Sequence, residues 1–114
     1  MLQFHERLTF AQRHDECQRV KKRRPDYIPT IMVQGDNMCP RIDKEKFLLP
    51  LDLTGGQISY VIRRRLKMSS ADALFLVCGG RLIPSNESVK MLYQQYMSDD
   101  GFLYITYTLE NAFG

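Results

Sequence analysis

The side chains that most often carry out chemistry in proteins are sparse in this sequence of 114 residues. Its three cysteines, Cys17, Cys39 and Cys78, lie far apart, and no two have the close spacing of a metal site or a redox pair. His5 and His14 have no further metal ligand at a regular spacing, and no set of serine, histidine and acid suggests hydrolysis. We therefore expect no enzymatic activity, no metal and no cofactor, and we interpret the cysteines as small apolar core residues.

The distribution of charge is more informative than its total of +3. Residues 1–27 hold seven Lys or Arg against four acids, whereas residues 28–114 hold nine of each sign. The odd number of dispersed cysteines indicates a reducing compartment such as the cytosol or nucleus. No apolar run reaches the ~18 residues of a membrane span, and residues 1–27 lack the apolar core of a signal peptide. A membrane role would therefore require surface binding or a covalent lipid.

The basic run Arg19–Arg24 has three interpretations. It can be a solvated helix end that matches the negative end of the helix dipole, a contact for anionic membranes or microtubules, or a nucleic-acid site. We rank nucleic acid last, because no interleaved aromatic residues accompany the run as stacking platforms. In a second run, Arg63–Arg65, we expect the arginines other than Arg65 to form the charged outer face of a helix.

Capping signals predict where the helices that position these residues begin. Thr9 with Gln12 forms a capping box, so a helix should start at Phe10, with Cys17 and Val20 on the same apolar stripe. Pro25 should end this helix, and a shorter helical turn is expected over residues 3–8.

The rest of the chain alternates between strand and helix patterns. We expect strands at 28–34, 47–49, 73–78 and 102–108, and helices after the Thr54/Gln57 capping box and over 89–96. This order predicts an α+β fold, the ubiquitin-like β-grasp, with a four-stranded mixed sheet and additional N-terminal helices. As parts of a single domain, we expect a basic helical segment at 1–27, the β-grasp core at 28–109 and a flexible tail at 110–114.

Eight short runs together carry a family resemblance. They occur in order over nearly the whole chain: Pro25-Asp26 with Ile28-Pro29, residues 43–50, Asp52-Leu53-Thr54 with Gln57, residues 62–66, residues 72–75, Leu92-Tyr93-Gln94, Phe102-Leu103-Tyr104 and Phe113-Gly114. On these runs the chain resembles the autophagy ubiquitin-like modifiers, the family that includes the GABA-receptor-associated protein and the microtubule-associated protein light chains.

The resemblance implies conjugation of Gly114 to phosphatidylethanolamine, with Phe113 as a recognition handle for processing. An activating enzyme and a conjugating enzyme would join the lipid, and a cysteine protease would expose the glycine and later release it. Glycine suits this chemistry because it has no side chain to obstruct narrow enzyme channels. The protein would be cytoplasmic, and it would lie on autophagosome membranes when lipidated.

The resemblance also implies a groove for cargo receptors and adaptors that carry an aromatic-x-x-aliphatic motif. The aromatic pocket would comprise Glu16, Val20, Pro29, Ile31, Lys46, Leu48 and Phe102. The aliphatic pocket would comprise Leu49, Pro50, Leu53, Ile58, Val61 and Ile62. Acidic residues that flank the motif would meet Lys44, Lys46 and Arg65.

Three positions depart from the family pattern, and two alternatives remain. Arg24 replaces an aromatic residue, Tyr27 replaces a basic one, and Thr30 replaces an aliphatic one, which affects the choice of partner more than conjugation. The apolar groove residues can also be ordinary core residues. The chain can instead be a ubiquitin-like interaction module that is not conjugated.

Overall fold

The computed structural model describes residues 2–36, 38–69 and 71–109. Two helices come first, α1 (Phe4–Arg7) and α2 (Phe10–Arg23). The predicted capping box begins α2: Thr9 Oγ1 accepts from the backbone N–H of Gln12, and the Gln12 side chain accepts from that of Thr9. These reciprocal bonds satisfy donors at the helix start that have no partner within the helix.

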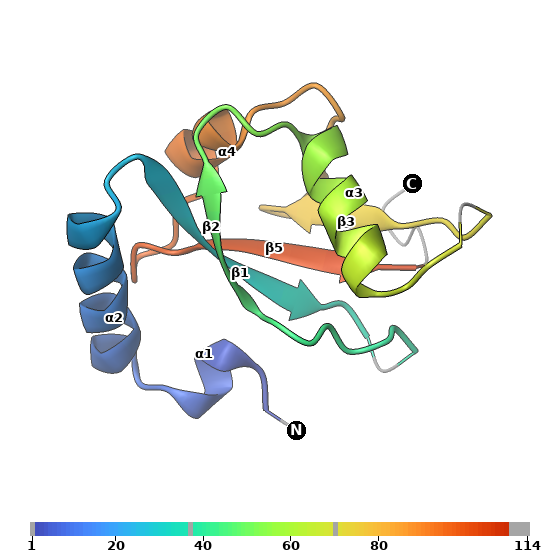
Figure 1. The fold of residues 1–114 in the computed structure, drawn as a ribbon. Helices are drawn as coiled ribbons and strands as arrows, with labels where there is room; N and C mark the ends of the chain where they lie inside the picture. Colours follow the sequence, from blue (N-terminus) through green and yellow to red (C-terminus); the bar gives the residue numbers. More distant parts are fainter. Residues whose placement is uncertain (1, 37, 70, 110–114) are drawn as a thin grey trace.

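Five strands form one mixed sheet in the order β2-β1-β5-β3-β4 (Figure 1). They are β1 (Tyr27–Gln34), β2 (Lys46–Pro50), β3 (Phe75–Cys78), β4 (Arg81–Leu82) and β5 (Leu103–Thr108). β1 pairs antiparallel with β2 and parallel with β5, and β3 pairs antiparallel with both β5 and β4. β5 therefore lies at the centre, whereas β2 has a neighbour on one side only.

Helices cover both faces of the sheet. α3 (Gly55–Arg65) and α4 (Val89–Tyr96) lie on one face, and α1 and α2 lie on the other (Figure 1). The larger core includes Met32, Ile58, Ile62, Leu92 and Ile105, whereas a smaller core contains Phe4, Cys17, Ile31 and Phe102. Neighbouring residues such as Ile31 and Met32 enter different cores because successive strand side chains point to opposite faces. Both faces of β5 are thus covered.

A buried carboxylate fastens α2 to the sheet. Asp100 is 1% exposed, and its Oδ2 accepts from Arg13 Nε at 3.0 Å and from the Tyr104 hydroxyl at 2.5 Å. Its Oδ1 accepts from the backbone N–H of Phe102 at 2.9 Å. Arg13 also donates to the backbone oxygens of His5 and Leu8, so one guanidinium connects α1, α2 and the start of β5.

Two expectations require correction. The sheet has a fifth strand, because Arg81–Leu82 folds back on β3 after Gly79 and Gly80, which both have positive φ as this tight turn requires. Phe10 does not join Cys17 in the core: it is 50% exposed and stacks on His14 with a 6.0 Å centroid separation.

Candidate functional site

A hollow of about 410 Å³ lies between α2 and the edge strand β2. Apolar side chains form much of its wall, with Pro29 and Phe102 buried and Leu48 38% exposed. Its lining residues are Glu16, Val20 and Arg24 from the end of α2, Tyr27, Pro29 and Thr30 from β1, Lys44, Lys46, Phe47 and Leu48 around β2, and Phe102. The hollow can therefore accept a large apolar side chain while its rim stays charged.

The backbone of β2 beside this hollow is free to pair. Pro29 has no N–H, and it is paired with Leu48 without removing a ladder bond, because this pair belongs to the non-hydrogen-bonded class. Met32 N donates to Glu45 O at 2.8 Å, so Met32 and Glu45 form a hydrogen-bonded pair. Hydrogen-bonded and non-hydrogen-bonded pairs alternate along the ladder, so the pairs of Lys46 and Leu48 both belong to the non-hydrogen-bonded class. In this class the N–H and C=O groups point away from the partner strand. Lys46 and Leu48 thus present backbone groups to the open edge.

The rim of this hollow is basic. Lys46 Nζ lies 2.5 Å from Glu16 Oε1, so these two charges compensate each other. Lys44 Nζ lies 5.1 Å from the centroid of the Phe47 ring, and Arg24 Cζ lies 4.5 Å from that of Tyr27. Such cation–π contacts orient a cation without neutralising it, so Arg24 and Lys44 leave the rim with positive charge.

The predicted aromatic pocket agrees closely with this hollow. Six of its seven residues line the hollow, and the exception is Ile31, which is 1% exposed and packs in the smaller core with Phe102. Sequence reasoning did not place Arg24 or Tyr27 in the pocket and treated them only as departures from a pattern. Their position on either side of Pro25, where α2 turns into β1, is the signal that could have placed them at the rim.

The residues of the predicted aliphatic pocket have mixed positions. Leu49, Ile58 and Ile62 are at most 6% exposed and belong to the larger core. Pro50 and Val61 are exposed and Leu53 is half-buried; the aliphatic pocket therefore stays a prediction, with these three residues as its surface part.

The third predicted cation, Arg65, is already engaged. Its Nη1 lies 3.1 Å from Asp43 Oδ1, and its Cζ lies 5.3 Å from the centroid of the Phe47 ring. An acidic partner would have to compete with Asp43 for this guanidinium.

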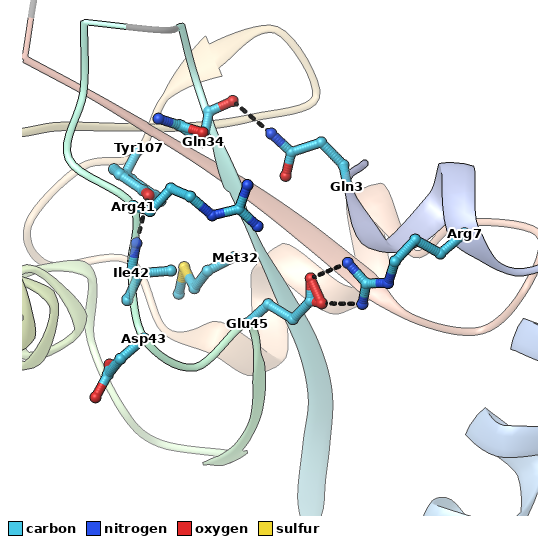
Figure 2. A pocket seen from close by; sticks show the side chains of 9 residues that line it. All are labelled: Gln3, Arg7, Met32, Gln34, Arg41, Ile42, Asp43, Glu45 and Tyr107. Atoms are coloured by element: carbon cyan, nitrogen blue, oxygen red, sulfur yellow. Dashed lines mark hydrogen bonds and ion pairs between the residues drawn. The ribbon is translucent and has the colours of Figure 1, made fainter. Parts of the chain in front are cut away.

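A second hollow, of about 280 Å³, lies beneath α1 (Figure 2). Arg7 forms a two-pronged ion pair with Glu45, and Gln3 Nε2 donates to Gln34 O at 3.5 Å. The Tyr107 hydroxyl on its wall accepts from Ile42 N at 3.0 Å. Most of these polar groups bind each other, so the arrangement fastens α1 to the sheet.

The buried cysteine thiols are poorly reactive. Burial raises the pKa of the Cys17 and Cys78 thiols to about 11, which keeps both protonated and poorly nucleophilic at neutral pH. Within the described ranges, no cluster of three His, Cys, Asp or Glu side chains could hold a metal ion. None of the helices in that part of the chain has the length and apolar character to cross a membrane. Phe113 and Gly114 lie outside the described residues.

Comparisons with known proteins agree with this arrangement. Residues 12–114 match the family model described as autophagy protein Atg8, ubiquitin like. The chain is 43% identical to autophagy-related protein 8 of Schizosaccharomyces pombe, covering 98% of this chain and 93% of the relative. It is also 43% identical to autophagy-related protein 8e of Arabidopsis thaliana, covering 92% and 87%.

The fold has a close match among solved structures. The crystal structure of Trypanosoma brucei ATG8 superposes with a TM-score of 0.89 at 33% identity, covering 100% of this chain and 99% of the other. The sheet, the capping helices and the sequence matches point to the same group. The chain belongs to the Atg8 family of ubiquitin-like autophagy proteins.

Proposed function

We propose that this protein is conjugated through Gly114 to phosphatidylethanolamine on autophagosomal membranes, where it recruits cargo receptors and adaptors carrying an aromatic-x-x-aliphatic motif. The observation that carries the recruiting role is the apolar hollow beside the open edge of β2. Family membership supports the conjugating role, with an activating enzyme, a conjugating enzyme and a processing cysteine protease as further partners. The protein would move from the cytoplasm to the membrane on conjugation.

Strand addition explains the spacing of the recognised motif. A peptide that pairs with the outward groups of Lys46 and Leu48 extends the sheet by one strand. Side chains three residues apart on such a strand point to opposite faces. The aromatic anchor would enter the hollow on the α2 face, and the aliphatic anchor would reach the α3 face near Leu53 and Val61. One extended peptide can thereby contact both faces of the sheet at the edge of β2.

The charges of the rim select the flanks of the motif. Arg24 and Lys44 contact rings, and Lys46 pairs with Glu16. Acidic residues next to the aromatic anchor would therefore be attracted, which raises the association rate and suppresses basic competitors.

Leu48→Ala tests the recruiting role, with Leu82→Ala as the matched control. The two leucines are 38% and 39% exposed and lie on opposite edge strands of the same sheet. Calorimetry with an acidic aromatic-x-x-aliphatic peptide should show Kd rising about tenfold for Leu48→Ala, or about 1.4 kcal/mol, and unchanged for Leu82→Ala. Equal Kd values for wild type and Leu48→Ala would contradict the groove assignment.

Reconstitution with activating enzyme, conjugating enzyme and vesicles containing phosphatidylethanolamine tests the conjugating role. Wild type should form a thioester and then a faster-migrating lipidated band, and Gly114→Ala should form neither while keeping its Tm. A wild-type protein that forms no thioester would instead be an interaction module without conjugation.

A further inference from the structure

A third hollow, of about 520 Å³, lies on the outer side of α3 and has a strongly positive wall. Its lining residues are Tyr60, Arg63, Arg64, Lys67, Met68 and Ser69, and none of these is acidic. We call these six residues the α3 basic surface. Tyr60 is 61% exposed, and Arg64 Cζ lies 5.8 Å from the centroid of its ring.

The hydrogen bonds of the two arginines leave their charge uncompensated, and the nearby Asp72 carboxylate instead accepts from Ser69 N and Ser69 Oγ, each at 3.3 Å. Arg63 Nη1 donates to the backbone oxygen of Asp72 at 2.7 Å, and Arg64 Nη1 donates to the Tyr60 hydroxyl at 3.3 Å. Both acceptors are neutral oxygens, so these bonds orient the guanidinium groups without cancelling their charge. The surface therefore favours an anionic ligand.

Lys67 occupies a position that favours glycine. Its φ is +56°, and it follows the last turn of α3, where Lys67 N donates to Arg64 O and Met68 N donates to Arg63 O. This pair of bonds is the Schellman ending, in which a left-handed residue without a side chain is least strained. A lysine at this position keeps a cation on the α3 basic surface despite the strain.

The fold places this surface at the end of the sheet where β5 finishes. Arg63 binds Asp72, which lies three residues before Phe75, and Phe75 is the strand partner of Thr108. Three residues span at most about 10 Å, and paired strands lie about 5 Å apart. Residues 109–114 can extend at most about 21 Å from Thr108. The α3 basic surface is thus within one tail length of a lipid attached to Gly114.

The other basic region lies at the far end. Arg24 precedes the start of β1, and β1 runs parallel to β5, so the run 19–24 is located beside the beginning of β5 (Figure 1). From the level of Tyr27 to that of Thr108 the sheet extends about 26 Å. The run 19–24 and the α3 basic surface look alike in the sequence, but the fold places them at opposite ends of the sheet.

We propose that the α3 basic surface binds the head groups of anionic phospholipids and so orients the membrane-attached protein. The inference rests on the proposed conjugation, because the tail brings this surface to the bilayer. Each cation held near an anionic surface strengthens binding by about fivefold, and an exposed tyrosine is suited to the interface between water and lipid. A ring beside arginines can also stack on RNA bases, but the position beside the tail exit favours the membrane.

Tyr60→Trp supplies a reporter at this surface, because the chain has no other tryptophan. We would attach this variant to vesicles of phosphatidylcholine and phosphatidylethanolamine, with or without phosphatidylserine. One arm uses enzymatic conjugation to phosphatidylethanolamine, and the other uses a C-terminal histidine tag held by a nickel-chelating lipid in the same vesicles. The readout is indole quenching by brominated lipid. Gel mobility separately reports conjugation, so a failed conjugation leaves the tagged arm to test the surface.

Quenching should require phosphatidylserine and should weaken with salt. The double substitution Arg64→Glu plus Lys67→Glu should lower the apparent affinity for the phosphatidylserine surface at least tenfold. The control is Arg81→Glu plus Lys90→Glu, which changes the charge equally on exposed residues of β4 and α4 and should have little effect. Equal quenching on neutral vesicles, or an equal loss in the control pair, would overturn the proposal. Tighter binding of an RNA oligonucleotide than of the vesicles, abolished by the same pair, would overturn it in favour of nucleic acid.

The substitution Lys67→Gly tests the role of this cation independently of the stability of the fold. Glycine relieves the positive φ, so Tm should rise while quenching on phosphatidylserine vesicles weakens several-fold. A higher Tm with unchanged quenching would overturn the role of this cation.

Discussion

Replacing Arg13 with methionine should lower the free energy of unfolding by about 3 kcal/mol, because it leaves the buried Asp100 carboxylate without its cation. The side chains of Arg13 and Asp100 are 17% and 2% exposed, so water can replace little of the lost contact. Breaking a buried pair from one side costs about 3–5 kcal/mol. We expect the lower end, since the Tyr104 hydroxyl and the Phe102 N–H continue to donate to the carboxylate.

Calorimetry and urea unfolding would measure this loss, which corresponds to about 12 °C in Tm for a chain of this length. Arg7→Met is the matched control, because it breaks the ion pair with Glu45, whose side chains are 38% and 23% exposed, and it should cost much less. Adding Asp100→Asn to Arg13→Met should restore part of the stability by removing the unpaired charge. Similar losses for Arg13→Met and Arg7→Met would refute the reasoning.

Three further outcomes follow from the same contacts. Burial and the bond to Asp100 raise the pKa of Tyr104 above its ordinary value, so its contribution is complete below pH ~10 and is lost as pH rises above that value; urea unfolding between neutral and alkaline pH should show this loss, and Tyr104→Phe should reduce it. The buried Cys17 and Cys78 thiols should react with a thiol reagent far more slowly than the same thiols after unfolding in urea, and equal rates would contradict their protection. Gly101→Ala should lower Tm by several degrees, because φ is +95° and the new Cβ would lie 2.7 Å from Cys17 Sγ; an unchanged Tm would show that this contact relaxes freely.

Local signals predicted the helices well because their causes are local. Thr9 with Gln12 and Thr54 with Gln57 form both reciprocal bonds, so the starts of α2 and α3 follow from residues three positions apart. The strands were also found to within about two residues, apart from β4. That strand has two residues, which is too short for any alternation to register.

The missed features depend on contacts between distant parts of the chain. Asp100 is buried beside Arg13, 87 residues away, and no local signal indicates this contact. Leu48 and Leu49 lie on opposite faces, as strand alternation requires, but their sequence does not say that Leu49 enters the larger core. Six of the seven residues that the family resemblance assigned to an aromatic pocket line one hollow, whereas Arg24 and Tyr27 needed the observed turn at Pro25 to be placed at its rim.

The central position of β5 also governs the order in which the fold can be completed. β1 and β3 can each pair with a neighbour that is near in sequence, but both need β5 to satisfy their inner edges. Thr30 pairs with Leu103, so closing the β1–β5 ladder requires a loop of about 70 residues to be ordered. Contacts this distant slow folding. Until β5 docks, two half-sheets with open edges coexist in one chain, and this is the stage at which association between unfinished molecules competes with folding.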